Sequence, residues 1–255
     1  MILDGVRVLV TGATDGLGRA MAAALADEGA AVAVTGRDPA RAAAVAAEIG
    51  AGRPGRVVGV GVDVRDDTAV TDGVAAVTDA LGGIDVLVNT AGIGMRTVNP
   101  RFLSQPGRFY DVDPDGFRDL MATNVTGYFL MARAVVPAMV AAGAGKVVNV
   151  SINEATMRRK GFVPYGPSRA ASEAMSQIMA ADLDGTGVTV NVVLPGGATR
   201  TGMIPDGVPE SARAALLDPA VMGPPVVWLA SNASDGVTGR RIVATEWPPP
   251  DLIAV

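Results

Sequence analysis

The sequence predicts a single-domain α/β fold in which helices cover both faces of one doubly wound, seven-stranded parallel sheet. Three observations predict it. Short Val-rich runs alternate with longer Ala-rich runs of helical spacing from one end of the chain to the other. The Val-rich runs are almost continuously apolar, as parallel strands are when both of their faces are covered. No linker, low-complexity tract or internal repeat interrupts the 255 residues, so one domain is expected over residues 1–255.

The individual elements follow from these runs. Seven strands are predicted, at Val6–Val10, Ala31–Thr35, Val57–Val60, Asp85–Val88, Lys146–Val150, Val188–Val193 and Arg241–Val243. Five helices are predicted between them, at Leu17–Gly29, Pro39–Ile49, Asp67–Leu81, Pro114–Ala142 and Pro164–Asp184. The last two helices carry Ala and Met on more than one face, and a helix that is apolar all round is buried. One face would cover the sheet, which leaves another for a second copy of the chain.

Composition argues against several classes of function. The net charge of −5 argues against a surface for nucleic acid or for an anionic membrane. The chain has no cysteine and no histidine, so no metal is expected, and acid–base chemistry must come from Tyr, Lys, Arg or carboxylates. The chain opens on a strand and no apolar run reaches 18 residues, which predicts a cytoplasmic protein outside the membrane. Only two of the 21 basic residues, Lys146 and Lys160, are lysines.

Glycines cluster between the first strand and the first helix, which is the context that a nucleotide-binding loop needs. Gly12 permits a tight turn, Gly16 lets the backbone approach a pyrophosphate, and Gly18 lets the helix lie close on the strand. The N–H groups at the helix start would then receive the phosphates. We therefore predict a dinucleotide site with contacts from Gly12, Thr14, Asp15, Gly16, Leu17 and Gly18.

The end of the second strand bears on the choice of cofactor. Arg37 would pair with a 2′-phosphate and select NADP(H), whereas an acidic residue such as Asp38 would bond a free 2′-hydroxyl and select NAD(H). Asp38 also precedes Pro39, an arrangement that suits a helix N-cap. If the Asp15 carboxylate points inward, it argues against NADP(H), because it would repel the extra anionic group. NADP(H) is the preferred prediction, and NAD(H) stays open.

The third and fourth strands end in residues that suit the rest of a dinucleotide. Asp63, which precedes Val64, would accept a hydrogen bond from the adenine amino group; the alternative is a cap for the following helix. The fourth strand ends in Asn89, Thr90, Ala91 and Gly92, and small residues there leave room for a cofactor lying across the strand ends. The predicted cofactor contacts therefore include Asp63, Val64, Asn89, Ala91 and Gly92.

Further motifs follow along the chain: Asn124-Val125-Thr126-Gly127, Tyr165, Pro195-Gly196 and Gly236-Val237-Thr238-Gly239. Together with the TGxxxGxG loop at residues 11–18, Asp63-Val64 and Asn89-Thr90-Ala91-Gly92, they resemble the short-chain dehydrogenase/reductase family from about Leu3 to Val243. The resemblance implies a Rossmann-type fold. It also implies hydride transfer between a nicotinamide and a carbonyl or alcohol carbon, and a homodimer or homotetramer.

The resemblance implies site residues as well. In this family a tyrosine exchanges the oxygen-bound proton, and a lysine four residues later binds the nicotinamide ribose. A serine about thirteen residues before the tyrosine bonds the substrate oxygen, and an asparagine anchors a relay water. Here the tyrosine is Tyr165 and the asparagine is Asn124. Arg169 stands at the lysine position and Ile152 at the serine position, with Ser151 one residue away.

Each departure from the family pattern has two interpretations. Arg169 would stay cationic and bond the ribose hydroxyls, although it cannot pass on a proton. A bulge or insertion would move Ser151 inward, or Asn153 or Thr156 would supply the missing donor near the substrate. On the other interpretation, Ile152 removes a hydrogen bond at the atom where charge develops, and losing such a donor costs on the order of 10²–10³ in rate.

Three segments near the expected substrate mouth are also open to two interpretations. Arg158-Arg159-Lys160 would bind a carboxylate or phosphate, or would be a solvated basic run. Residues 94–116 would shape the pocket or form an ordinary surface excursion. Residues 195–222, rich in Gly and Pro, would close over the nicotinamide. The contacts expected from the last segment are Pro195, Gly196 and Thr199 or Thr201, while Trp228 and Trp247 are expected to pack.

These observations lead to one preferred function and one alternative. The preferred function is an NADP(H)-dependent oxidoreductase that interconverts a carbonyl and an alcohol on a small organic molecule. Tyr165 would be the acid/base, Arg169 its electrostatic partner and Asn124 the relay anchor. The alternative is a protein of the same fold that has lost hydride transfer and acts as an isomerase, cyclase or lyase, or as a non-catalytic nucleotide-binding subunit.

Overall fold

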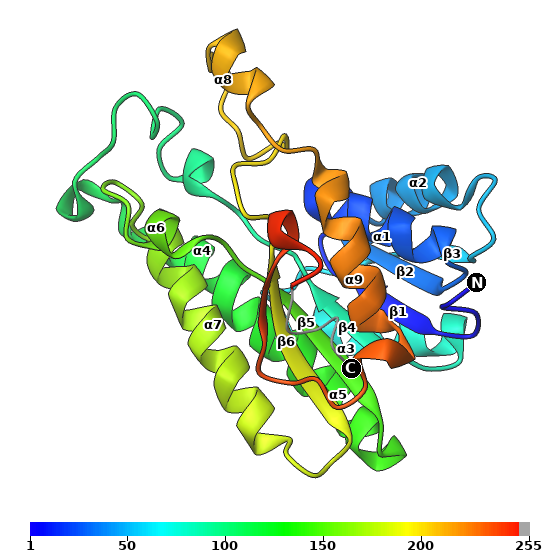
Figure 1. Ribbon diagram of the computed structural model, residues 1–255. Helices are drawn as coiled ribbons and strands as arrows, with labels where there is room; N and C mark the ends of the chain where they lie inside the picture. Colours follow the sequence, from blue (N-terminus) through cyan, green and yellow to red (C-terminus); the bar gives the residue numbers. More distant parts are fainter. Residues whose placement is uncertain (250–255) are drawn as a thin grey trace.

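In the computed structural model, which describes residues 1–249, seven parallel strands form one sheet (Figure 1). The strands are β1 (Arg7–Val10), β2 (Ala31–Gly36), β3 (Val57–Gly61), β4 (Val86–Asn89), β5 (Gly145–Val150), β6 (Val188–Leu194) and β7 (Arg241–Val243). Their order is β3-β2-β1-β4-β5-β6-β7, so the chain winds outward from β1 and then outward again from β4. The predicted doubly wound sheet is confirmed, and its winding reverses between β1 and β4, where open α/β sheets bind ligands.

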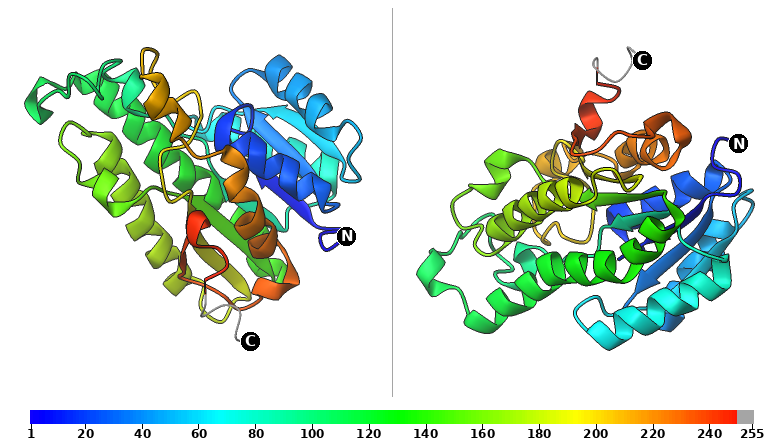
Figure 2. Two further views of the ribbon diagram at one scale, coloured as in Figure 1. Left: turned by 45° about the horizontal axis from the view of Figure 1, so that its top comes forward. Right: turned by 90° about the horizontal axis from the view of Figure 1, so that it is seen from below.

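Helices cover both faces of the sheet, as predicted (Figures 1 and 2). The α-helices are α1 (Gly16–Asp27), α2 (Pro39–Gly50), α3 (Asp67–Leu81), α4 (Pro114–Met121), α5 (Gly127–Ala142), α6 (Glu154–Met157), α7 (Tyr165–Asp182), α8 (Glu210–Ala214) and α9 (Gly223–Ala230). The buried residues of α1, α2 and α9 pack on one face, and those of α3, α5 and α7 on the other. Most predicted boundaries lie within one or two residues of these bounds.

Two apolar cores explain why the strands are nearly continuous in hydrophobicity. Val8 and Val10 of β1 point into the core beneath α1 and α9, whereas Leu9 between them points into the core beneath α3 and α5. Successive strand residues face opposite sides, so a strand covered on both faces is apolar at most of its positions. The predicted packing role of the two tryptophans is confirmed: the Trp228 and Trp247 rings lie 5.3 Å apart against the first core.

The helical run predicted at 114–142 is present over these residues, but it contains a turn of a different helix type. A π-helical turn at Ala122–Thr126 separates α4 from α5, and such turns are frequent at functional sites. By length and hydropathy alone this run is apolar enough to cross a membrane, with a mean hydropathy of 1.5. Met131, Val135 and Met139 are nevertheless packed into the second core, so α5 serves here as a core helix of the sheet.

Candidate active site

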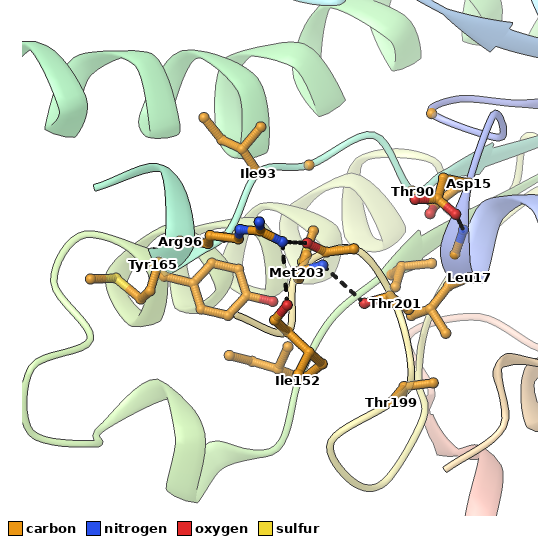
Figure 3. Close-up of a pocket in the computed structure, with 18 of the residues that line it drawn as sticks. Asp15, Leu17, Thr90, Ile93, Arg96, Ile152, Tyr165, Thr199, Thr201 and Met203 are labelled. Atoms are coloured by element: carbon orange, nitrogen blue, oxygen red, sulfur yellow. Dashed lines mark hydrogen bonds between the residues drawn. The ribbon is translucent and has the colours of Figure 1, made fainter. Parts of the chain in front are cut away.

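A pocket of about 790 Å³ runs along the C-terminal ends of the strands. Fifteen of the predicted cofactor contacts line it: Gly12, Thr14, Asp15, Gly16, Leu17, Gly18, Arg37, Asp63, Val64, Ala91, Gly92, Tyr165, Arg169, Pro195 and Thr199. The predicted substrate-side residues Ser151, Ile152 and Asn153 line it too. Figure 3 shows side chains from the start of α1, from the segments after β4, β5 and β6, and from the start of α7 around this space. The topology therefore brings together residues that are up to 187 positions apart in the sequence (Gly12 to Thr199).

The glycine-rich loop is packed tightly against the end of β4. Gly12 has a φ of +61°, and a Cβ on it would lie 2.6 Å from the Ala91 Cα. A side chain here would be strained and would also push the two strand ends apart. Thr11, the first residue of the TGxxxGxG loop, ties the same ends together, because its Oγ1 accepts hydrogen bonds from the N–H groups of Thr90 and Ala91 at 3.0 and 3.1 Å.

The start of α1 faces the pocket. The Asp15 carboxylate caps the helix by accepting the Gly16 N–H at 2.8 Å, which holds Asp15 at the helix start. The N–H groups of Leu17 and Gly18 lie in the first turn, where the helix itself offers no acceptor. Together with the positive end of the helix dipole, they suit an anionic group such as a pyrophosphate.

The two charged residues after β2 have different surroundings. Asp38 caps α2, as predicted, with its Oδ1 accepting the N–H groups of Ala40 and Arg41 at 2.9 and 3.2 Å. Arg37 is exposed at the pocket, and within residues 1–249 it has no hydrogen bond or ion pair. The cation is thus available to a ligand, whereas the carboxylate already binds the helix start.

Asp63 is engaged by a neighbouring cation. Arg65 donates to its carboxylate at 2.6 and 2.9 Å and also pairs with Asp119. The hydrogen bonds from Arg65 hold the pKa of Asp63 below its usual range. The alternative role as a helix cap is wrong, since Asp66 caps α3 through the Ala69 N–H.

Two predicted cofactor residues do not line the pocket. Asn89 is fully buried, and its Nδ2 donates to Asn149 Oδ1 at 3.0 Å, so this side chain joins β4 to β5 instead of reaching the cofactor cleft. The Gly196 carbonyl accepts the Asn153 Nδ2 at 2.8 Å, which fixes the loop after β6. Asn89 and Gly196 thus belong to motifs beside the site, but the contacts that they make join parts of the fold to one another.

Tyr165 begins α7 at the wall of the pocket. Figure 3 shows its hydroxyl directed into the cavity on the side of Ile152. Its ring lies 6.4 Å from the Phe162 ring, and Phe162 packs edge-on against Phe102 at 5.5 Å. These three rings form an apolar wall beside the hydroxyl.

Arg169 is a buried cation, with only 3% of the residue exposed. Its Nη1 donates to the Tyr128 hydroxyl at 2.9 Å and to the Val150 carbonyl at 3.0 Å, and its Cζ lies 5.4 Å from the centre of the Tyr165 ring. Among residues 1–249 no carboxylate pairs with it. Burial opposes the charged form, but the hydroxyl groups of Tyr128 and Tyr165 outweigh it and raise the pKa of Arg169, so the side chain stays protonated.

Asn124 lies in the π-helical turn beside the pocket, without lining it. Its amide accepts the Ile93 N–H at 2.9 Å and donates to the Ile93 carbonyl at 3.0 Å and to Ser168 Oγ at 3.1 Å. Its peptide carbonyl accepts the Ser172 hydroxyl at 2.8 Å. The side chain thus fixes the backbone that follows β4, and the relay role expected of Asn124 stays a prediction.

The segment after β5 contains Ile152, the second departure from the family pattern. The backbone pairing of β5 with β6 continues through the Ser151 N–H, which donates to the Val193 carbonyl at 2.9 Å. The bulge considered for this segment is therefore not present. The Ser151 hydroxyl is buried, and no partner for it lies within the described part of the chain. Asn153 is bound to Gly196, and Ile152 presents an apolar side chain to the pocket.

Comparison with known proteins decides the family. The sequence model described as short chain dehydrogenase matches residues 6–210. The chain belongs to the short-chain dehydrogenase/reductase family. It is 32% identical over 244 residues to 2,5-dichloro-2,5-cyclohexadiene-1,4-diol dehydrogenase from Sphingobium indicum, a match covering 93% of each chain. It is 32% identical to 3-oxoacyl-[acyl-carrier-protein] reductase from Vibrio harveyi, over 95% of this chain and 96% of that one.

Solved structures agree with this assignment. A short-chain type dehydrogenase/reductase from Mycobacterium marinum superposes with a TM-score of 0.81 at 30% identity, covering 97% of both chains. A dehydrogenase/reductase from Sinorhizobium meliloti 1021 gives 0.79 at 32% identity, over 94% of both. The chain is therefore an NAD(P)-dependent short-chain dehydrogenase/reductase.

Two loops of this dehydrogenase/reductase meet over the pocket. Arg96 donates to the Asp206 carboxylate at 2.6 Å. It also donates to the Gly202 carbonyl at 3.2 Å, and so joins the loop after β4 to the loop after β6 (Figure 3). The first part of the 94–116 segment therefore shapes the pocket. Its far part does not, because Phe109 and Tyr110 are exposed and lie outside the main pocket.

The basic run Arg158-Arg159-Lys160 of this dehydrogenase/reductase also lies partly at the pocket and partly outside it. Arg159 lines the pocket, whereas Arg158 pairs with Glu154 at 3.7 Å and Lys160 is exposed outside it. Tyr128 is not predicted as a site residue, because one tyrosine within an apolar helical run has the pattern of a core residue. Only the fold shows that its hydroxyl reaches Arg169.

Proposed function

We propose that the protein is an NADP(H)-dependent oxidoreductase that interconverts a carbonyl and an alcohol on a small organic molecule, with Tyr165 as the acid/base. The observation that carries the proposal is the pairing of Tyr165 with Arg169. The tyrosine hydroxyl faces the pocket, and the buried guanidinium beside it has no carboxylate partner among residues 1–249. A cation in that position stabilises the phenolate that remains after Tyr165 has donated its proton.

The residues present fit a dinucleotide along the whole pocket. The pyrophosphate would lie at the start of α1, over Gly12 and Gly16. The nicotinamide ribose would lie near Arg169, and the nicotinamide near Thr199. When bound, NADP(H) supplies or accepts the hydride.

The chain's own residues transfer the proton and exclude water. In the reductive direction, the Tyr165 hydroxyl donates its proton to the carbonyl oxygen; in the oxidative direction, it accepts the proton from the alcohol. Arg169 remains protonated throughout and acts by its charge. The wall formed by Phe102, Phe162 and the Tyr165 ring shields the reacting oxygen from bulk water.

The preference for NADP(H) rests on the surroundings of Arg37 and Asp38. Replacing Arg37 with serine is expected to weaken NADPH binding about 10- to 100-fold, because a charge-assisted bond to the 2′-phosphate is lost. NADH binding should stay within about twofold. Titration of nicotinamide fluorescence measures both affinities. Arg41→Ser is the matched control, since Arg41 is exposed on α2 outside the pocket. Equal losses for NADPH and NADH would contradict this role of Arg37.

Deuteride transfer tests the reaction itself. The protein is mixed with NADPH deuterated on the transferred position and a panel of ketones, aldehydes and quinones, and the products are analysed by mass spectrometry. The proposal expects deuterium on the carbinol carbon of a product. The same panel is run with an Ile152→Ser, Arg169→Lys double variant, which restores the residue types of the family.

The alternative function rests on Ile152. A protein that places an apolar side chain beside the acid/base has lost one donor to the reacting oxygen, and this favours an isomerase, cyclase or lyase, or a nucleotide-binding subunit. If only the double variant transfers deuteride, this alternative replaces the proposal. If neither protein transfers it while both bind NADPH, a binding subunit is the better description.

We also propose a cytoplasmic homodimer or homotetramer. Phe129 and Val140 on α5 and Ile178 on α7 are exposed apolar residues on the two helices predicted to have a second apolar face. Covering such residues with a second copy removes apolar surface from water.

A further inference from the structure

The walls of the substrate half of the pocket have a distinct character. Met95, Phe102, Phe162 and Met203 are apolar, and within the described chain the acidic residues that line the pocket are Asp15 and Asp63, both at the cofactor end. Arg96 is already bound to Asp206. Arg159 is different, since its guanidinium has neither a carboxylate partner nor a hydrogen bond among residues 1–249. Among the described residues, the substrate half therefore has one positive charge without a partner, on Arg159, which is exposed and lies beside the Phe162 ring.

Arg159 is held at the wall that leads to the acid/base. Its Cζ lies 5.0 Å from the centre of the Phe162 ring, and Phe162 contacts Tyr165. Stacking on an aromatic face orients the guanidinium while leaving its N–H groups free for a planar oxyanion. Its neighbour Arg158 pairs with Glu154 and lies outside the pocket, so the two adjacent arginines have different surroundings.

Resting on the proposed carbonyl–alcohol chemistry, we propose that the substrate is a carbonyl or alcohol compound with an apolar body and a carboxylate, which Arg159 binds. The test compares 4-oxo-4-phenylbutanoate with its methyl ester. The acid is expected to have a kcat/KM about tenfold above that of the ester, since a charge-assisted bond is lost in the ester. Arg159→Gln should abolish the difference, Arg158→Gln should keep it, and high salt should reduce it.

A binding measurement separates failure of this inference from failure of the proposed reaction. Calorimetry on the Tyr165→Phe variant with NADP⁺ measures acid and ester affinity without turnover. Tighter binding of the acid that depends on Arg159 supports the inference even where no turnover occurs. Equal affinities, binding of neither compound, or a preference that survives Arg159→Gln would overturn it.

A second inference rests on a separate observation, the environment of Arg169. The guanidinium is forked, and Tyr128 and the Val150 carbonyl hold the Nη1 arm. A Cβ on Gly92 would lie 2.4 Å from Nη2, so the absence of a side chain there makes room for the other arm. Tyr128 is itself buried on α5, and its hydroxyl donates to Val150 O at 3.2 Å.

We infer that Tyr128 is a positioning residue: its hydroxyl holds the Arg169 guanidinium so that an arginine can act at the position where the family has a lysine. A lysine there would end one bond earlier, at the level of the arginine Cζ, and would not need the tyrosine. Tyr128→Phe is therefore expected to weaken NADPH binding and lower kcat about tenfold in the natural protein. In an Arg169→Lys background the same change should have less than about a twofold effect.

The comparison is a double-mutant cycle with two measurements, kcat and the NADPH dissociation constant. The dissociation constant tests the inference even if the proposed reaction is not found. Tyr110→Phe is the control, because Tyr110 is exposed and does not line the pocket. A merely structural tyrosine would give the same loss in both backgrounds, and that result would overturn the inference.

Discussion

Replacing Tyr165 with phenylalanine is expected to lower kcat for hydride transfer about 10³-fold, within the range that general acid–base catalysis contributes. The chain has no histidine or cysteine to take over the proton. The Arg169 Cζ lies 5.4 Å from the centre of the ring, but the raised pKa of Arg169 prevents it from donating a proton. Single-turnover oxidation of NADPH, followed by absorbance, measures the effect on the chemical step.

This variant should leave the binding of NADPH nearly unchanged. Phenylalanine keeps the ring that packs against Phe162, and Arg169 remains held by Tyr128 and Val150. A kcat within threefold of that of the natural protein would contradict the assignment of Tyr165 as the acid/base. A parallel collapse of NADPH binding and thermal stability would instead indicate that the hydroxyl has a structural role.

The fold could be predicted because its signals are local and repeated. Val8, Leu9 and Val10 of the first strand are apolar in succession, as two covered faces favour, and the Asp38-Pro39 pair marks the start of α2. The glycine loop could likewise be placed, since Gly12 is needed for a close approach between β1 and the segment after β4. Each of these features depends on backbone geometry that a short stretch of sequence determines.

The parts that could not be predicted depend on side-chain direction and on distant partners. Asn89 belongs to a motif that predicts a cofactor contact. Its side chain is instead buried and donates a hydrogen bond to Asn149 on the neighbouring strand β5. The bond between Tyr128 and Arg169 joins residues 41 positions apart on two helices. The π-helical turn that carries Asn124 interrupts a run whose apolar spacing predicts an unbroken helix. In all three cases the decisive contact comes from tertiary packing.

Introducing a hydroxyl at position 152 is expected to raise activity. Ile152→Ser should increase kcat/KM for a reducible ketone about 10²-fold, because it supplies a donor to the oxygen on which negative charge develops. Ile152 lines the pocket beside the Tyr165 hydroxyl, so the shorter serine opens space into the pocket itself. Steady-state oxidation of NADPH with one ketone substrate measures the change.

Two further variants show whether the hydroxyl causes the gain. Ile152→Ala enlarges the same space without a donor and should give less than about a threefold change. Adding Tyr165→Phe to Ile152→Ser should remove the gain, because the donor assists a proton transfer that Tyr165 performs. An equal gain in Ile152→Ala would mean that the isoleucine only restricts access. No gain in Ile152→Ser would mean that another group, such as the unpartnered Ser151 hydroxyl, already serves the reacting oxygen in the natural protein.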